Sequence, residues 1–241
     1  MQNNKKIIVI SDNYDIAKGF ISILNELKIN INLFKFYCSY NSFSINNNNF
    51  EPLRLKDNIK KITSEFKLLI SLHCLQIIPP QIIKSIKCIN LHPGYNPYNR
   101  GWFPHVFSIL NGLPAGASLH EMDEKIDHGP LIAQKQVPVL SYDTSASLYE
   151  KIQKAELELL KENLINILNN KYTTIKLDDG NINTKLDYEK LCHIKTDEIT
   201  TFGKAIDRLR ALSHNNYKNA WFIDKTTGKK IFIKIELYPE N

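Results

Sequence analysis

Short apolar runs alternate with amphipathic segments along the first two thirds of the chain. Runs rich in isoleucine, leucine and valine predict strands at 6–10, 31–38, 67–71, 86–90, 117–121 and 131–139. Apolar residues at helical spacing predict helices at 15–27, 57–65, 79–86, 103–111 and 143–168, the last capped by Thr144 or Ser145. The alternation through residue 111 predicts βαβ units. We therefore expect an α/β fold with a mostly parallel twisted sheet flanked by helices.

The end of the chain has a different pattern. Residues 171–185 are polar and irregular, and apolar spacing returns at 199–212, where it predicts a helix. Two further runs, 220–224 and 230–237, flank the sequence Lys-Thr-Thr-Gly-Lys. This arrangement is typical of a β-hairpin.

These patterns divide the chain into a domain at 1–185 and a small region at 186–241 that holds a helix and a β-hairpin. The small region is too short for a sizeable core of its own. It should pack on the first domain or on another subunit. Within the first domain, 39–50 is rich in asparagine and serine and predicts a loop.

Composition narrows the class of protein. The chain has 241 residues, 43% hydrophobic and 23% charged, as in soluble globular proteins. No apolar run is long enough to span a membrane, and the run near the N-terminus predicts a first strand and not a signal peptide. The net charge is +6, but the lysines are spread along the chain, so we expect no nucleic-acid partner. Four scattered cysteines indicate reduced thiols, and we expect a cytoplasmic protein.

Candidate chemistry begins where the 86–90 run ends. Asn90 and His92 flank Leu91, and because side chains alternate along a strand, the amide and the imidazole should share one face. Such a pair can donate to a developing oxyanion and shuttle a proton. The alternative is a turn in which the asparagine and the following proline play a local role only.

Other polar residues follow within forty positions. Asp127 precedes His128-Gly129-Pro130, which is ordinary loop chemistry, and His120 fits a buried histidine at a strand end. The histidines lack the spacing of metal ligands, so we expect no metal. Tyr98, Arg100 and Trp102 share one loop and suit a ligand with a planar base and phosphates, or else pack on the neighbouring helix. No dinucleotide or ATP motif is present.

Taken in order, these motifs resemble one enzyme family. The set is Asn90-Leu91-His92-Pro93-Gly94, Arg100-Gly101, Gly112-Leu113-Pro114-Ala115-Gly116, His120-Glu121-Met122-Asp123 and Ile126-Asp127-His128-Gly129-Pro130. It resembles the formyltransferases that use 10-formyltetrahydrofolate, over about residues 60–170. The run from His92 to His105 is most similar to the branch that acts on dTDP-amino sugars. Gly94 stands where most relatives with other acceptors have a serine.

The resemblance implies a Rossmann-like fold and roles for individual residues. Asn90, His92 and Asp127 match the catalytic triad of the family. 10-Formyltetrahydrofolate, as co-substrate, should lie near five residues: His73, Leu75, Ile77, Met122 and Asp123. The sugar nucleotide should contact Tyr98, Arg100, Trp102, Arg210 and Trp221.

The resemblance also implies an acceptor. We expect formyl transfer to the amine of a dTDP-amino-dideoxy sugar, dTDP-4-amino-4,6-dideoxyglucose in the first place, for O-antigen or another surface polysaccharide. The alternatives are another small amine, such as a 3-amino sugar or glycinamide ribonucleotide, and a folate-binding regulator without catalysis. The region at 186–241 should close the nucleotide pocket, contribute to a homodimer, or do both.

Overall fold

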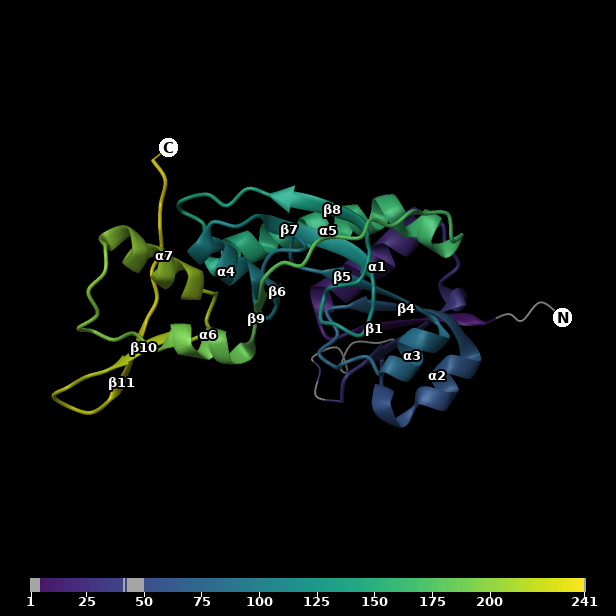
Figure 1. Ribbon diagram of the computed structural model, residues 1–241, viewed down its shortest axis with the longest axis horizontal. Helices are drawn as coiled ribbons and strands as arrows, with labels where there is room; N and C mark the ends of the chain where they lie inside the picture. Colours follow the sequence, from purple (N-terminus) through teal and green to yellow (C-terminus); the bar gives the residue numbers. More distant parts are fainter. Residues whose placement is uncertain (1–4, 41, 43–49, 241) are drawn as a thin grey trace.

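A seven-stranded sheet is formed between residues 6 and 137 in the computed structural model, which describes residues 5–40, 42 and 50–240 (Figure 1). Its strand order is β3-β2-β1-β4-β5-β7-β8. The strands are β1 (Lys6–Ser11), β2 (Phe34–Cys38), β3 (Glu51–Pro52), β4 (Phe66–Leu72), β5 (Lys87–His92), β7 (Ala115–Glu121) and β8 (Leu131–Val137). The strands from β3 to β5 pair in parallel, and β7 and β8 are antiparallel. The prediction of a mostly parallel α/β sheet is confirmed.

Two helical layers cover the sheet, because its central strands are apolar on both faces. Along β1, Ile7 and Val9 enter one core cluster and Ile8 and Ile10 enter the other. The helices are α1 (Tyr14–Glu26), α2 (Ile59–Glu65), α3 (Pro80–Ser85), α4 (Pro104–Asn111) and α5 (Ser145–Leu168). Residues of α1, α4 and α5 join the first cluster, and residues of α2 and α3 join the second, so the two groups lie on opposite faces (Figure 1).

Local side-chain interactions determine where two of the elements begin. Residues Ile31–Leu33 form a 3₁₀ turn capped by the Asn30 side chain, so the strand expected from 31 begins at Phe34. Helix α5 is capped by Thr144, which forms a capping box with Ser147 and thereby decides between the two expected caps. The loop expected at 39–50 lies mostly outside the described residues.

The segment at 171–185 is less irregular than its composition indicates. A two-residue strand β9 (Ile182–Asn183) pairs in parallel with β6 (Arg100–Gly101), which follows β5 in the chain. Ile175 forms a further bridge to Leu131 at the start of β8. These pairings place the segment against the loop that follows β5 and against the start of β8.

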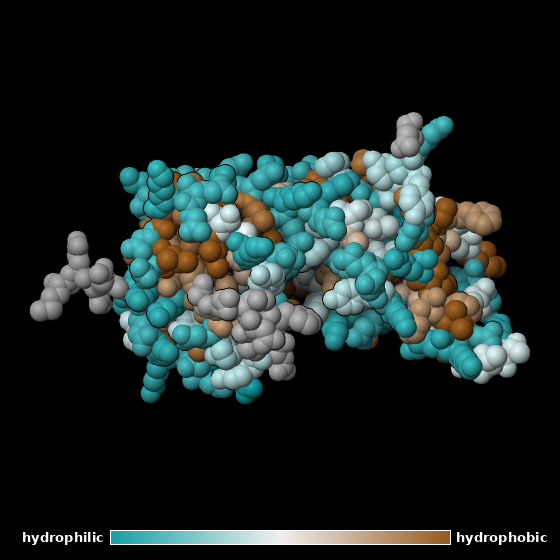
Figure 2. All heavy atoms as spheres, turned by 180° about the vertical axis from the view of Figure 1, so that it is seen from behind, coloured by the Kyte–Doolittle hydropathy of each residue, from teal (hydrophilic) through white to brown (hydrophobic). Residues whose placement is uncertain are grey.

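The C-terminal region contains α6 (Lys185–Cys192), α7 (Phe202–Leu212) and a hairpin of β10 (Ala220–Ile223) and β11 (Lys230–Ile233). The hairpin and α7 were expected from the sequence, and α6 was not. A small cluster of Cys192, Leu212 and Ala220 forms the interior of the C-terminal region. Apolar side chains remain on its surface, among them the exposed Ile199, Phe202, Tyr217 and Tyr238, and Figure 2 shows apolar residues gathered over this end of the molecule.

Among the described residues, no helix has the length and apolarity needed to cross a membrane.

Candidate active site

A buried polar cluster lies at the carboxyl end of β5. This strand pairs in parallel with β4 on one side and antiparallel with β7 on the other. Leu91 is fully buried in the apolar core, whereas Asn90 and His92 both approach Asp127. The alternation inferred from the sequence therefore holds. The carboxyl ends of strands in open α/β sheets are where ligands usually bind.

Asp127 is held in the connection between β7 and β8 by several hydrogen bonds. Its backbone adopts a left-handed conformation, with φ of 46°. Asn90 Nδ2 donates to Asp127 Oδ1 over 3.1 Å, and the Gly101 amide donates to Oδ2 over 3.1 Å. Asn96 Nδ2 donates to the Asp127 carbonyl oxygen over 2.9 Å. The carboxylate is thus fixed from β5 and from the loop after it.

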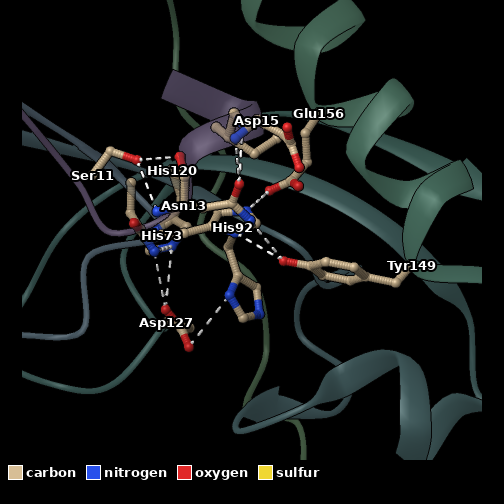
Figure 3. Close-up of polar contacts among 11 residues, drawn as sticks. Ser11, Asn13, Asp15, His73, His92, His120, Asp127, Tyr149 and Glu156 are labelled. Carbon is tan, nitrogen blue, oxygen red and sulfur yellow. Dashed lines mark hydrogen bonds and ion pairs between the residues drawn. The ribbon is translucent and has the colours of Figure 1, made fainter. Parts of the chain in front are cut away.

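His92 is a neutral base in this cluster. Burial lowers the pKa of His92 from 6.5 to about 4, although the Asp127 carboxylate opposes the shift. Nδ1 of His92 lies 3.5 Å from Asp127 Oδ2, and because a carboxylate only accepts, this contact favours the tautomer with the proton on Nδ1. Nε2 retains its lone pair and has no hydrogen-bond partner among the described residues. Figure 3 shows the imidazole directed at Asp127.

Gly94 lies against the unpaired nitrogen, which is buried. A Cβ atom at this position would lie 2.4 Å from His92 Nε2 and 2.8 Å from Cδ2 of the same ring. Any side chain at position 94 would therefore displace the imidazole. The glycine allows His92 to keep its orientation toward Asp127.

His120 belongs to the same cluster, although the sequence suggested only a buried histidine. It stands opposite Asn90 across the β5–β7 ladder. Its Nδ1 lies 2.7 Å from the Glu121 carbonyl oxygen and so carries the proton, which leaves Nε2 to accept from Asn90 Nδ2 over 3.4 Å. His120 thereby orients the Asn90 amide. The antiparallel register, which the sequence did not reveal, is what brings the two residues together.

A second buried cluster lies beside the first, at the end of β4. His73 has a φ of 57°, and its Nε2 lies 2.7 Å from Glu156 Oε1 on α5. Its Nδ1 contacts Tyr149 Oη at 3.1 Å and Asn13 Nδ2 at 3.3 Å (Figure 3). Glu156 is fully buried, and burial raises its pKa. Sequence reasoning placed His73 near the folate but gave no signal for Glu156, Tyr149 or Asn13.

The other expected folate residues follow the strands β4 and β7. Leu75 and Ile77 follow β4 and are 74% and 88% exposed, which is unusual for large apolar side chains. Met122 is half-buried and continues β7, and Asp123 Oδ2 lies 2.6 Å from His128 Nδ1. These positions leave an apolar surface open next to the buried clusters.

The residues expected to bind the sugar nucleotide do not form one group. Trp102 is exposed and Tyr98 half-buried, whereas Arg100 is buried, with Nη2 donating to the Gly180 carbonyl oxygen over 3.4 Å. Arg210 is also buried, on α7, and Trp221 stacks on His193 with ring centroids 4.2 Å apart.

The Arg210 guanidinium is engaged within the protein. It donates to the carbonyl oxygens of Leu140 and Asp143 and to the Asp207 carboxylate. No contact among the described residues joins Arg210 or Trp221 to Arg100. In the described part of the chain, no group of three or more histidine, cysteine or acidic side chains is placed so that it could hold a metal ion.

Comparison with known proteins defines the class. The family described as formyl transferase matches residues 2–164, and the N-formyltransferase dimerization C-terminal domain matches residues 187–239. The chain therefore belongs to the formyltransferase family, whose members are enzymes that transfer a one-carbon formyl group.

Individual relatives are similar over most of the chain. A dTDP-4-amino-4,6-dideoxyglucose formyltransferase of Mycobacterium tuberculosis is 42% identical over 185 residues, which is 76% of this chain and 79% of that protein. The crystal structure of a 4-N formyltransferase from Francisella tularensis superimposes with a TM-score of 0.92 at 42% identity, covering 99% and 100% of the two chains. A formyltransferase from Anoxybacillus kamchatkensis, in complex with tetrahydrofolate and a UDP-linked formamido sugar, gives a TM-score of 0.61 at 25% identity, covering 77% of this chain and 89% of that chain.

Proposed function

We propose that this protein transfers the formyl group of 10-formyltetrahydrofolate to the amine of dTDP-4-amino-4,6-dideoxyglucose. The observation that carries the proposal is the cluster of Asn90, His92 and Asp127, in which a neutral imidazole has one buried nitrogen without a hydrogen-bond partner among the described residues. The 42% identical relatives named for this sugar or for 4-N formylation support the acceptor. The relative in complex with tetrahydrofolate supports the co-substrate.

His92 is the proposed base. When the sugar amine attacks the formyl carbon, it must lose a proton, and His92 Nε2 is a free lone pair suited to accept it. The C–N bond to the folate then breaks, and the same proton passes from Nε2 to the leaving nitrogen. His92 is thus unchanged after one turnover, as general acid–base catalysis requires.

Asn90 is the proposed donor to the formyl oxygen as it gains negative charge. One hydrogen of the amide group bonds to Asp127. The other is directed at His120 over a longer distance of 3.4 Å. The developing oxyanion is a stronger acceptor than a neutral imidazole and would replace His120 as the partner. A donor of this kind contributes about 3 kcal/mol to transition-state stabilisation.

Asp127 is the proposed orienting residue. Its Oδ2 faces His92 Nδ1 and stabilises the imidazolium that forms when Nε2 takes the proton. Its Oδ1 holds Asn90 on the other side. One carboxylate thereby aligns the base and the oxyanion donor.

The binding residues are proposed on the same basis. The exposed Leu75 and Ile77 offer an apolar surface for the folate, next to His73, Met122 and Asp123. Tyr98 and Trp102 lie on the loop after β5, where a nucleotide handle would hold the sugar amine near His92. Arg100, Arg210 and Trp221 have partners within the protein and would have to exchange them to touch the nucleotide.

We also propose a homodimer in the cytoplasm. The match to a dimerization domain and the exposed Ile199, Phe202 and Tyr238 support pairing through 186–241, as a unit separate from 1–185. The thiols of Cys38, Cys74, Cys88 and Cys192 are free, which suits a reducing compartment. The formylated nucleotide sugar would serve as a glycosyl donor for O-antigen or another surface polysaccharide.

A panel of acceptors with 10-formyltetrahydrofolate tests the function. The panel holds dTDP-4-amino-4,6-dideoxyglucose, a dTDP-3-amino sugar, glycinamide ribonucleotide and the free 4-amino sugar, and mass spectrometry detects the gain of one formyl group. We expect kcat/KM to be highest for the dTDP-4-amino sugar and very low for the free sugar, because remote binding energy positions the amine. Preference for the 3-amino sugar or for glycinamide ribonucleotide would contradict the acceptor, and no formylation at all would contradict the activity.

A further inference from the structure

A short segment between the two parts of the chain, residues 179–183, lies against the loop that follows β5; we call it the strap. Two of its carbonyl oxygens accept backbone hydrogen bonds from that loop. The Arg100 amide donates to Asn181 over 3.1 Å, and the Trp102 amide donates to Asn183 over 2.9 Å. The strap and the loop thus form the β6–β9 ladder.

The ladder sets the direction of the Gly101 amide, which lies between those of Arg100 and Trp102. Successive N–H groups of a strand point to opposite sides, so the Gly101 amide must face away from the strap. It donates instead to Asp127 Oδ2 over 3.1 Å. Gly101 has a φ of 90°, and a Cβ here would lie 2.5 Å from the Asn183 carbonyl oxygen, so the close pairing needs a glycine.

Asn181 holds Asn99, the residue directly before β6, in its conformation. Its Oδ1 accepts from the Asn99 amide over 2.8 Å, and its Nδ2 donates to Asn99 Oδ1 over 2.7 Å. Asn99 is fully buried with a φ of 51°, a conformation that costs energy unless its surroundings impose it. Asn181 provides two of the bonds that impose it.

The strap contacts the catalytic loop at two further points. Gly180 packs on Pro97, where a Cβ would lie 1.8 Å from the proline carbonyl oxygen. Asp179 Oδ1 lies 3.2 Å from Nε2 of His128, the residue after Asp127. Both contacts flank the hydrogen bonds that hold Asp127.

We propose that Asn181 is a positioning residue, which acts through Asn99 and the Gly101 amide to hold the Asp127 carboxylate in place for formyl transfer. This inference rests on the role given to Asp127 in the proposed function. It makes the junction between the two parts of the chain a component of the active site, although no strap side chain touches the reacting atoms.

A double-mutant cycle on the full-length enzyme tests the inference. Asn181→Ala is made alone and together with Asp127→Asn, and kcat and both KM values are measured with the formyl acceptor found in the panel. Asp178→Ala is the matched control, because Asp178 is an exposed strap neighbour to which the structure gives no side-chain partner. Thermal melting of every variant verifies that it folds.

We expect Asn181→Ala to lower kcat about tenfold with little change in either KM, because a misplaced catalytic group slows the chemical step. In the Asp127→Asn background the same substitution should have almost no effect, since the residue through which it acts is already lost. Asp178→Ala should retain wild-type kcat. If Asn181→Ala does not fold, Asn181→Asp keeps the size and one acceptor, and its smaller loss should vanish in the same background.

Two outcomes would overturn the inference and leave the proposed function intact. One is an equal loss of kcat in both backgrounds, and the other is an Asn181 variant that changes only KM or nothing. A wild-type kcat for Asp127→Asn alone would instead refute the role of Asp127 in the proposed function. The single variants therefore distinguish the two failures.

Discussion

Two buried histidine clusters lie next to each other at the ends of β4 and β5, and burial acts on them with opposite chemical results. Burial lowers the pKa of His92 to about 4 and raises the pKa of Glu156. In both cases the cause is that a charged group is costly away from water. The shift favours the unprotonated form of His92 and the protonated form of Glu156.

The two clusters also differ in how their imidazoles are bonded. Both ring nitrogens of His73 have partners, in Glu156, Tyr149 and Asn13. His92 has Asp127 near one nitrogen and nothing bonded to the other. Each cluster has one buried polar atom without a partner among the described residues, but in the β5 cluster it is a base nitrogen, whereas in the β4 cluster it is Oε2 of Glu156, a carboxyl group whose pKa burial raises. We infer that the β5 cluster performs the chemistry and that the β4 cluster holds the fold around it.

The largest expected effects separate the clusters directly. Asn90→Ala, His92→Asn and Asp127→Asn should each lower kcat by at least about 10²-fold, because each removes a contact made in the transition state. Steady-state kinetics on folded protein measure the loss. Near-normal turnover in any one of the three would remove that residue from the mechanism.

A smaller loss is expected when His92 is displaced and not removed. Gly94→Ala places a methyl group 2.4 Å from the present position of His92 Nε2, so the ring must turn away from Asp127. We expect kcat to fall roughly tenfold or more, with a melting temperature near that of the wild type. Gly112→Ala is no suitable control because its φ is 70°, whereas Gly203→Ala meets no atom and should be neutral in kcat. Equal rates for the two variants would mean that Gly94 does not govern the imidazole.

The β4 cluster should respond in stability more than in rate. Glu156→Gln keeps the size of the side chain but weakens its bond to His73, and should cost about 1 kcal/mol in the free energy of unfolding. Chemical denaturation measures this change, and kcat should fall far less than in His92→Asn. A loss of kcat as large as that of His92→Asn, in a stable protein, would move Glu156 into the catalytic machinery.

The pH dependence of kcat tests whether His92 stays unprotonated, and the expected changes are modest. A histidine with a lowered pKa is neutral above that value and becomes charged only as pH falls through it. His92 should therefore stay an active base down to about pH 4, with no inflection at its ordinary 6.5. A kcat profile measured with saturating substrates should rise with pH only as the acceptor amine deprotonates. A step near 6.5 that disappears in His92→Asn would show that His92 is not shielded from water.

We expect the removal of metal ions to have no effect on the formylation rate. In neither histidine cluster, as far as the structure describes the chain, are three histidine, cysteine or acidic side chains placed so that they could hold a metal ion. Dialysis against a strong chelator should leave the formylation rate unchanged, because neither cluster offers the ligand set of a bound metal. Loss of activity that zinc restores would contradict the expectation.

The sequence was informative where a local pattern determines the structure. Alternation along β5 predicted that Asn90 and His92 share a face, and the Lys-Thr-Thr-Gly-Lys turn predicted the C-terminal hairpin. Both depend on neighbours within a few residues. The positions of these elements were therefore predictable before any tertiary contact was known.

The rest depends on contacts between distant residues. His120 reaches Asn90 only through the antiparallel register of β7, and Glu156 reaches His73 only because α5 packs on the sheet. The strap had the composition of an irregular linker, yet Asn181 bonds Asn99 across 82 positions of the chain. Arg100 was a phosphate candidate from its chemistry and Arg210 from the resemblance, and the sequence did not reveal that both bond backbone carbonyl oxygens of distant residues.

The pairing of β5 with β7 has a consequence for how enzymes of this architecture can diversify. The ladder sets Asn90 opposite His120, whatever path the chain takes between the two strands. That path, from Pro93 to Pro114, can change in length and composition while the sheet keeps the pair in register. Selection for a new acceptor can thus change the connection between β5 and β7. The strands meanwhile keep in place the residues that formyl transfer to every acceptor needs.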